Sequence, residues 1–117
     1  MTELRYNLNT ALRRLSASYY VILDNPPLAL ELVGAAATSY ARVVDILRNK
    51  SRELWSRAED IRRQVGAIYA QLEDVVMGSL IDGYKVSSKT LEDIRNNIKS
   101  AIDKTITLYA EVVRKAL

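Results

Sequence analysis

The stretch ARVVDILRNKSRELWSRAEDI, residues 41–61, decides between two helical folds for this chain. Apolar residues continue through it at helical spacing, in one heptad phase with Leu30 and Val33 before it and Ile68 and Leu72 after it. Neither Gly nor Pro interrupts the stretch. The unbroken phase predicts a single helix of roughly fifty residues, which would be about 75 Å long.

The charges in the same stretch instead favour a helix break at residues 49–51. Arg48 and Lys50 suit a helix C-terminus, where cations are stabilised by the helix dipole. Ser51 suits the N-cap of a following helix, and Glu53 suits its first turn. A break here gives four helices of similar length and predicts an all-α, antiparallel four-helix bundle. The alternative is two helical hairpins that share one long central helix, and that fold needs a partner chain to cover it.

The other breaks in the chain are few. Residues 24–27, Asp-Asn-Pro-Pro, predict the end of a first helix that begins after Thr2 and the start of a second with proline in its first turn. The stretch 78–88, with Asp82-Gly83 inside it, predicts the loop before a last helix that runs to about Ala116. No sustained period-two alternation occurs, so we expect one helical-bundle domain over residues 1–117.

The apolar stripes on the predicted helices are wide, which means that each helix touches at least two neighbours. In the last helix, for example, a seam that includes Ile98 and Leu108 is flanked by a second apolar row that includes Ile106 and Val113. Residues in the middle of these stripes should be almost fully buried. This set comprises Leu15, Val44, Leu54, Ile61, Ile68, Leu72, Ile98 and Leu108.

The composition argues against an enzyme. The chain has 117 residues, of which 49% are apolar and 26% charged, as in an ordinary globular domain. It contains neither Cys nor His, so thiolate chemistry and the side chain that titrates nearest neutral pH are both missing. The adjacent acids, such as Glu59-Asp60, point about 100° apart on a helix and do not converge on one ligand. We therefore expect no catalytic residue, cofactor site or metal site.

A basic segment is the strongest positive feature of the sequence. Guanidinium groups bind phosphate oxygens in a forked geometry, and an indole can stack on an unpaired base. Acidic residues between the cations favour the alternative, a solvated face with ordinary ion pairs. The candidate nucleic-acid-binding residues are Arg48, Lys50, Arg52, Trp55, Arg57, Arg62 and Arg63.

Two functional hypotheses follow. The first is a structural or assembly subunit that acts through helix–helix contacts, as a homo-oligomer or with another helical protein. It rests on the wide apolar stripes and on seven tyrosines in a chain without Phe. The second is a sequence-independent nucleic-acid-binding protein that uses the segment from Arg48 to Arg63. The longest apolar stretch, residues 28–41, is too short for a membrane span. We expect a cytoplasmic protein, or a virion component in the case of a coat subunit.

Overall fold

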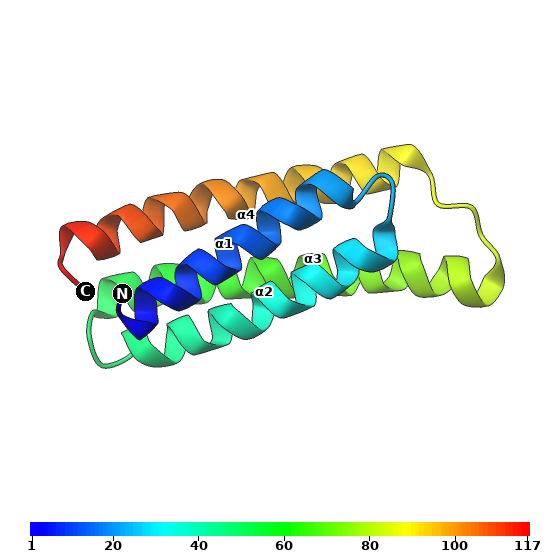
Figure 1. Cartoon of the computed structure of the whole chain (residues 1–117). Helices are drawn as coiled ribbons and strands as arrows, with labels where there is room; N and C mark the ends of the chain where they lie inside the picture. Colours follow the sequence, from blue (N-terminus) through cyan, green and yellow to red (C-terminus); the bar gives the residue numbers. More distant parts are fainter.

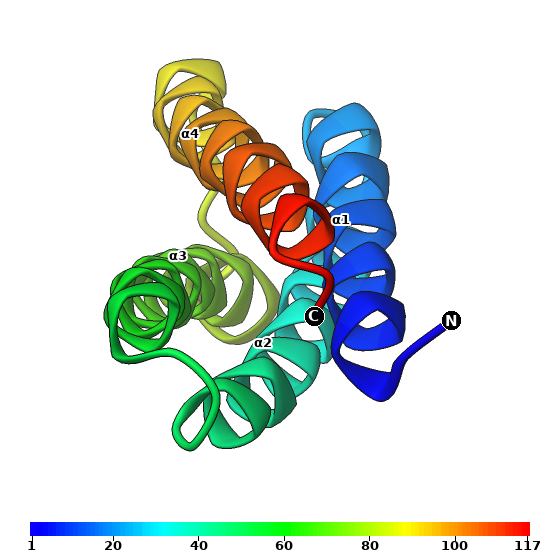
Figure 2. The ribbon, with the colours of Figure 1, turned by 90° about the vertical axis from the view of Figure 1, so that its left-hand side faces the viewer.

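The computed structural model describes all 117 residues and contains four α-helices and no strand. These are α1 (Glu3–Val21), α2 (Pro26–Leu47), α3 (Arg52–Asp82) and α4 (Ser88–Arg114). The helices run alternately up and down, and α1 also packs against α4, which closes the bundle (Figures 1 and 2). The molecule measures 48 × 20 × 20 Å. The predicted antiparallel four-helix bundle is confirmed.

A side-chain cap begins every helix. Thr2 Oγ1 accepts a hydrogen bond from Arg5 N–H at 3.2 Å, and Ser87 Oγ accepts one from Thr90 N–H at 3.1 Å. Asn25 caps α2 in the same way, and Pro26 and Pro27 occupy the first positions of that helix. Such caps pair backbone N–H groups that have no partner inside the helix, typically contributing about 1 kcal/mol each.

The break predicted at residues 49–51 is present, so the long central helix of the alternative fold is excluded. Ser51 has an extended backbone, with φ −160° and ψ 113°, and its Oγ accepts a hydrogen bond from Leu54 N–H at 3.2 Å. Just before it, the N–H groups of Lys50 and Ser51 both donate to Leu47 O and close the turn. The turn folds α3 back along α2.

The loop between α3 and α4 is shorter than the sequence predicted. Helix α3 continues through Gly78 and ends at Asp82, with Gly83 in the left-handed conformation (φ 71°) as its C-cap. A break beginning at Gly78 was therefore wrong. A glycine inside a helix costs only about 1 kcal/mol, which the flanking helix can tolerate, whereas the positive φ at Gly83 suits glycine specifically.

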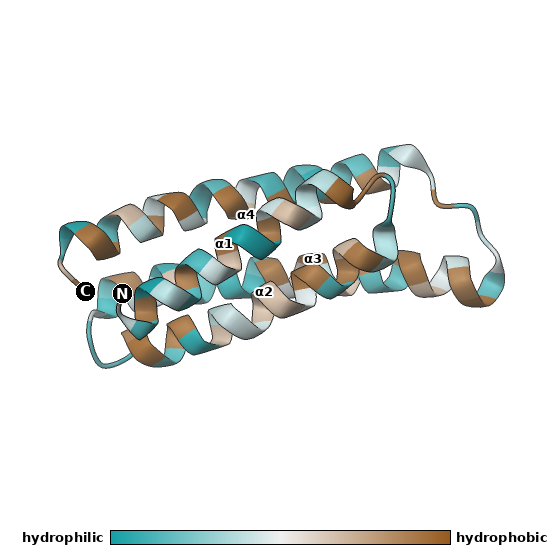
Figure 3. Cartoon of the chain, in the orientation of Figure 1, coloured by the Kyte–Doolittle hydropathy of each residue, from teal (hydrophilic) through white to brown (hydrophobic).

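Packing against the core explains which apolar residues are buried. All eight predicted core residues are at most 4% exposed. In α2, Ala29 and Ala36 are buried, whereas Leu30 of the predicted heptad phase and Ala37, one heptad after it, are partly exposed. A straight helix drifts by about 20° per heptad, so a strict heptad count moves off the buried face over several turns. Hydrophilic and hydrophobic residues alternate along each helix, as the colours of Figure 3 show.

One polar pair crosses the core between α2 and α4. The Tyr40 hydroxyl and Thr105 Oγ1 are hydrogen-bonded, and both residues are fully buried. Thr105 Oγ1 also donates to Ala101 O at 2.7 Å, so the Tyr40 hydroxyl is the donor within the pair. Burial raises the pKa of Tyr40 far above its ordinary value of 10.0, and the hydrogen bond with Thr105 opposes part of that rise.

Truncating a core leucine should destabilise the bundle strongly. For Leu15→Ala, Leu54→Ala and Leu108→Ala we expect a loss of about 2–5 kcal/mol each, because each leaves a cavity where a fully buried side chain stood. Urea unfolding followed by circular dichroism measures the change. Leu28→Ala, at a 39% exposed position, serves as the control with a smaller loss. Unchanged stability in the three core variants would mean that the helix faces are misassigned.

Tyr40 should make the folded state sensitive to alkali. Below pH 10 its hydroxyl is neutral in both states, and above pH 10 it ionises first in the unfolded chain because burial raises the pKa of the folded form. The free energy of unfolding should therefore fall by about 1.4 kcal/mol per pH unit from this group as pH rises above 10. Urea titrations of Tyr40→Phe should show a correspondingly flatter alkaline limb. Tyr20→Phe, at a 74% exposed position, should keep the slope of the parent protein.

Candidate functional site

The structure places the predicted basic residues around the turn between α2 and α3 and along the first three turns of α3. Arg48 and Lys50 lie in the turn, and Arg52 begins α3. Arg48 forms an ion pair with Asp45 at 3.5 Å, in which both side chains are more than half exposed. Lys50 and Arg52 are exposed and have no carboxylate within ion-pair distance. These two are the exposed unpaired cations at this end of the bundle.

Arg62 and Arg63 share one acidic partner. Arg62 binds Glu59 through Nε and a terminal nitrogen, and Arg63 Nε lies 3.4 Å from the same carboxylate. The hydrogen bond from Arg62 is the main reason that the pKa of Glu59 is lowered. The carboxylate therefore stays ionised at neutral pH and offsets part of the charge of both arginines. Arg62 and Arg63 therefore contribute less positive charge to a phosphate-binding surface than two unpaired arginines would.

Trp55 does not present its indole to solvent as a free stacking platform. The side chain is partly buried and packs against the core cluster, and its Nε1 is buried without a hydrogen-bond partner. Stacking on a nucleic-acid base requires an accessible ring face. The structure accordingly favours a packing role for Trp55, at the position where α3 leaves the turn.

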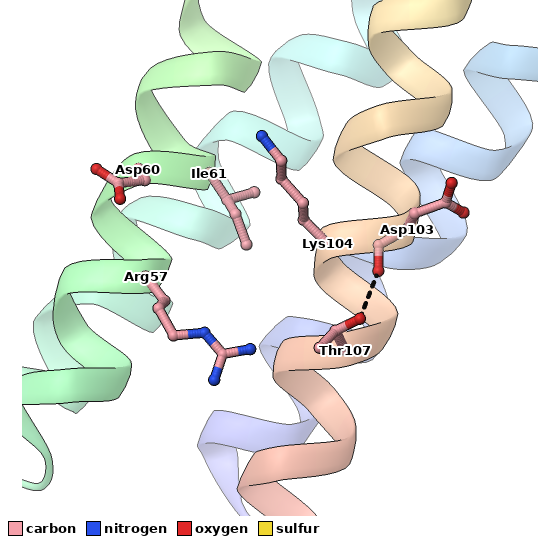
Figure 4. Close-up of a pocket in the computed structure, with 6 residues that line it drawn as sticks. All are labelled: Arg57, Asp60, Ile61, Asp103, Lys104 and Thr107. Carbon is pink, nitrogen blue, oxygen red and sulfur yellow. Dashed lines mark hydrogen bonds between the residues drawn. The ribbon is translucent and has the colours of Figure 1, made fainter.

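Arg57 lies apart from the other cations, in an open groove of about 340 Å³ between α3 and α4. Its guanidinium extends across the groove toward Thr107, while Asp60 points away (Figure 4). Lys104 on the α4 side donates to Gln64 Oε1 at 3.1 Å, and Asp103 is paired with Lys99 at 2.7 Å. The groove thus combines charges of both signs, of which Lys104 and Asp103 are engaged with neighbours and Arg57 and Asp60 are unpaired. No group of three or more acidic residues is placed to hold a metal ion.

The bundle end that holds the turn between α2 and α3 has a surplus of positive charge, and we call it the basic end. It comprises residues 1–8, 41–58 and 108–117, which Figure 1 shows side by side at the end where both termini lie. These segments contain eight Lys or Arg residues and four Asp or Glu residues. The sequence pattern identified the centre of this surface, but α4 and α1 add the cations Arg114, Lys115 and Arg5, which only the fold brings there.

The opposite end of the bundle carries an exposed apolar surface that the sequence analysis missed. Helix α3, with 31 residues, is longer than α2, with 22, and its last turns reach beyond the turn between α1 and α2 (Figure 1). Three large apolar side chains in these last turns and one in the loop that follows are exposed by 43–71%. We call them the apolar tip, and they are Met77, Leu80, Ile81 and Tyr84.

The apolar tip adjoins further apolar surface at the same end. A shallow groove beside it is lined by Pro26 and Pro27 of α2 together with Leu80 and Val86. Leu23 and Leu28, in and after the turn between α1 and α2, are 41% and 39% exposed. Single exposed leucines are normal on protein surfaces, whereas a contiguous group at one end is typical of a contact surface.

Comparison with known protein families, curated proteins and solved structures gives no match for this chain. None of the four helices has a segment long and apolar enough to cross a membrane. The surfaces described above are therefore the basis on which a function is assigned.

Proposed function

We propose that this protein is a non-enzymatic structural subunit that self-associates through helix contacts made by the apolar tip. The observation that supports this most is the projection of α3 beyond the neighbouring helices, with Leu80 and Ile81 exposed by 68% and 71%. Full burial of one such side chain in an interface contributes about 1.5–3 kcal/mol relative to exposure. A few of these side chains, packed together, are enough to drive association.

The acid–base groups of the chain are consistent with a role that needs no catalysis. The acidic residues with a shifted pKa are Glu59 and Glu111, and in both the pKa is lowered, mainly by a hydrogen bond from Arg62 and Arg114 respectively. A general acid or base needs a pKa near the working pH, and these shifts move the groups away from it. Buried Tyr40 faces Thr105 inside the core, where no substrate reaches it.

The helices leave further apolar side chains exposed outside the tip. Ile106 and Val113, from the second row of α4, are 50% and 43% exposed, and Tyr6 on α1 is 61% exposed. Ile106 lies on the body of the bundle, and Tyr6 and Val113 lie singly on two different helices, whereas the tip gathers four residues at the end of α3 and in the loop after it. The tip is therefore the stronger contact surface, and Ile106 provides a control.

The parent protein should form oligomers at tens of micromolar in near-physiological salt. Replacing Leu80 and Ile81 with Gln removes apolar surface but keeps good helix formers, so the fold should persist while the oligomers dissociate toward monomer. Size-exclusion chromatography with light scattering gives the mass of each species. Ile106→Gln, at a 50% exposed position outside both ends of the bundle, is the control and should leave the oligomer intact. A parent protein that stays monomeric over this range contradicts the proposed function.

A second candidate function is nucleic-acid binding at the basic end. It is favoured by the excess of eight cationic over four acidic side chains there, and by the exposure of Lys50 and Arg52 without ion-pair partners. Binding of this kind would be electrostatic and independent of sequence, because phosphate contacts carry no base information. The partly buried Trp55 gives no reason to expect a preference for single strands.

The free cations should account for most of any such binding. Lys50→Ser with Arg52→Ser should weaken binding to duplex DNA roughly tenfold at low salt, and the parent affinity should fall steeply as salt is raised. Arg13→Ser with Lys104→Ser removes the same charge from the middle of the bundle and is the control. Fluorescence anisotropy with a labelled duplex measures both. Equal affinities for the parent and the Lys50/Arg52 variant would exclude this end as the binding site.

A further inference from the structure

The two ends of the bundle carry opposite charge. The end that holds the apolar tip comprises residues 18–31 and 72–95, which contain seven Asp or Glu residues and three Lys or Arg residues. We call it the acidic end. The basic end has the reverse balance, with eight cations and four acids. The net charge of +3 for the whole chain thus conceals an acidic surplus of four at one end and a basic surplus of four at the other.

Most charges at the acidic end have no ion-pair partner within the chain, whereas at the basic end the four acids each pair with a cation and four cations remain unpaired. At the acidic end, Asp93 is paired with Lys89, whereas Asp24, Asp74 and Asp82 have no cation within 4.0 Å. At the basic end the unpaired charges are Arg5, Lys50, Arg52 and Arg57, and of these Lys50 and Arg52 are exposed. Each end therefore presents charge that a partner of opposite sign can neutralise.

The apolar area at the acidic end is close to what a specific interface needs. The apolar tip together with Leu23 and Leu28 exposes on the order of 600 Å² of side-chain surface, and a stable interface buries about 800 Å² on each partner. The basic end offers Val113, 43% exposed, and the partly exposed Trp55 and Leu117. An interface between the two ends would have an apolar centre and a rim of opposite charges.

We propose that the acidic end of one copy, led by the apolar tip, docks on the basic end of a second copy, so that the chains associate head to tail. This inference rests on the proposed function and names the partner of the tip. Contact between two acidic ends would bring like charges together, and so would contact between two basic ends. Because the two surfaces lie at opposite ends of a bundle 48 Å long, the contact can repeat from copy to copy. Such a heterologous interface builds open chains rather than closed dimers.

Charge reversal at one end tests the head-to-tail arrangement. Lys50→Glu with Arg52→Glu cancels the positive surplus of the basic end, and Asp74→Lys with Asp82→Lys cancels the negative surplus of the acidic end. All four positions are exposed, and Glu at position 52 in the first turn and Lys at position 82 in the last turn of α3 suit the helix dipole, so the fold should persist. Each double variant alone should associate at least ~tenfold more weakly than the parent at low salt, and the difference should shrink at high salt.

An equimolar mixture of the two double variants should restore association. The unchanged acidic end of the first variant then meets the unchanged basic end of the second, so a contact with the full opposite surpluses is available again. At the other contact, the introduced glutamates of one variant face the introduced lysines of the other. Sedimentation velocity of each variant and of the mixture measures this, with circular dichroism to verify the helix content. Arg13→Glu with Lys104→Glu changes the net charge by the same amount in the middle of the bundle, and it should associate like the parent protein.

The other outcomes separate this inference from the proposed function. If reversal of Lys50 and Arg52 has no effect while loss of Leu80 and Ile81 abolishes association, the copies meet tip to tip and the head-to-tail inference is overturned. It is overturned as well if the mixture stays dissociated, if the Arg13/Lys104 control is equally weakened, or if reversal at the basic end removes only nucleic-acid binding. A parent protein that is monomeric throughout overturns the inference and the proposed function together.

Discussion

Ser51 Oγ accepts a hydrogen bond from Leu54 N–H, and this cap ends what would otherwise be a continuous apolar stripe through α2 and α3. The stripe on each helix is too wide for a single neighbour to cover. Once the chain reverses at residues 48–51, α2 and α3 cover each other, and the outer helices close the bundle by packing on each other. This turn is therefore required for the packing that buries Leu15 on α1 and Leu108 on α4.

The fold was predictable because its determinants are local. Each cap is a Ser, Thr or Asn side chain that bonds a backbone N–H within three residues, so the signal can be read without knowing the tertiary structure. The core stripes are local as well, since helical spacing places Ile61, Ile68 and Leu72 on one face. The predictions that were wrong concern features that depend on the course of a helix over many residues. Ala36 is buried in place of Ala37 because of helix drift, and Gly78 stays helical because the turns on both sides hold it.

The candidate surfaces were harder to predict, for physical reasons that differ from residue to residue. The pairing of Glu59 with Arg62 and Arg63 follows from i,i+3 and i,i+4 spacing and could be read from the sequence. The burial of the Trp55 Nε1 could not, because it depends on neighbours from other helices. The exposure of Leu80 and Ile81 depends on where α1 and α2 end relative to α3, and helix lengths are the least certain part of a sequence pattern.

Opposite charges are separated between the two ends because the fold brings together segments that each carry a small excess of one sign. Residues 41–58 are basic and residues 72–95 are acidic, and α3 alone would hold these segments apart at its two ends. The up-and-down path then adds the acidic turn between α1 and α2 to the acidic end, and the ends of α1 and α4 to the basic end. The core runs through the whole length of the bundle, because its 26 buried apolar residues come from both ends as well as from the middle. Stability therefore comes from inward-facing side chains, whereas most of the unpaired charges and exposed large apolar side chains lie on the outer surface of the two ends. Substitutions on these outer surfaces can change their charge without unfolding the protein, because the residues that maintain the fold lie elsewhere. A subunit whose contacts with its neighbours are adjustable needs this property.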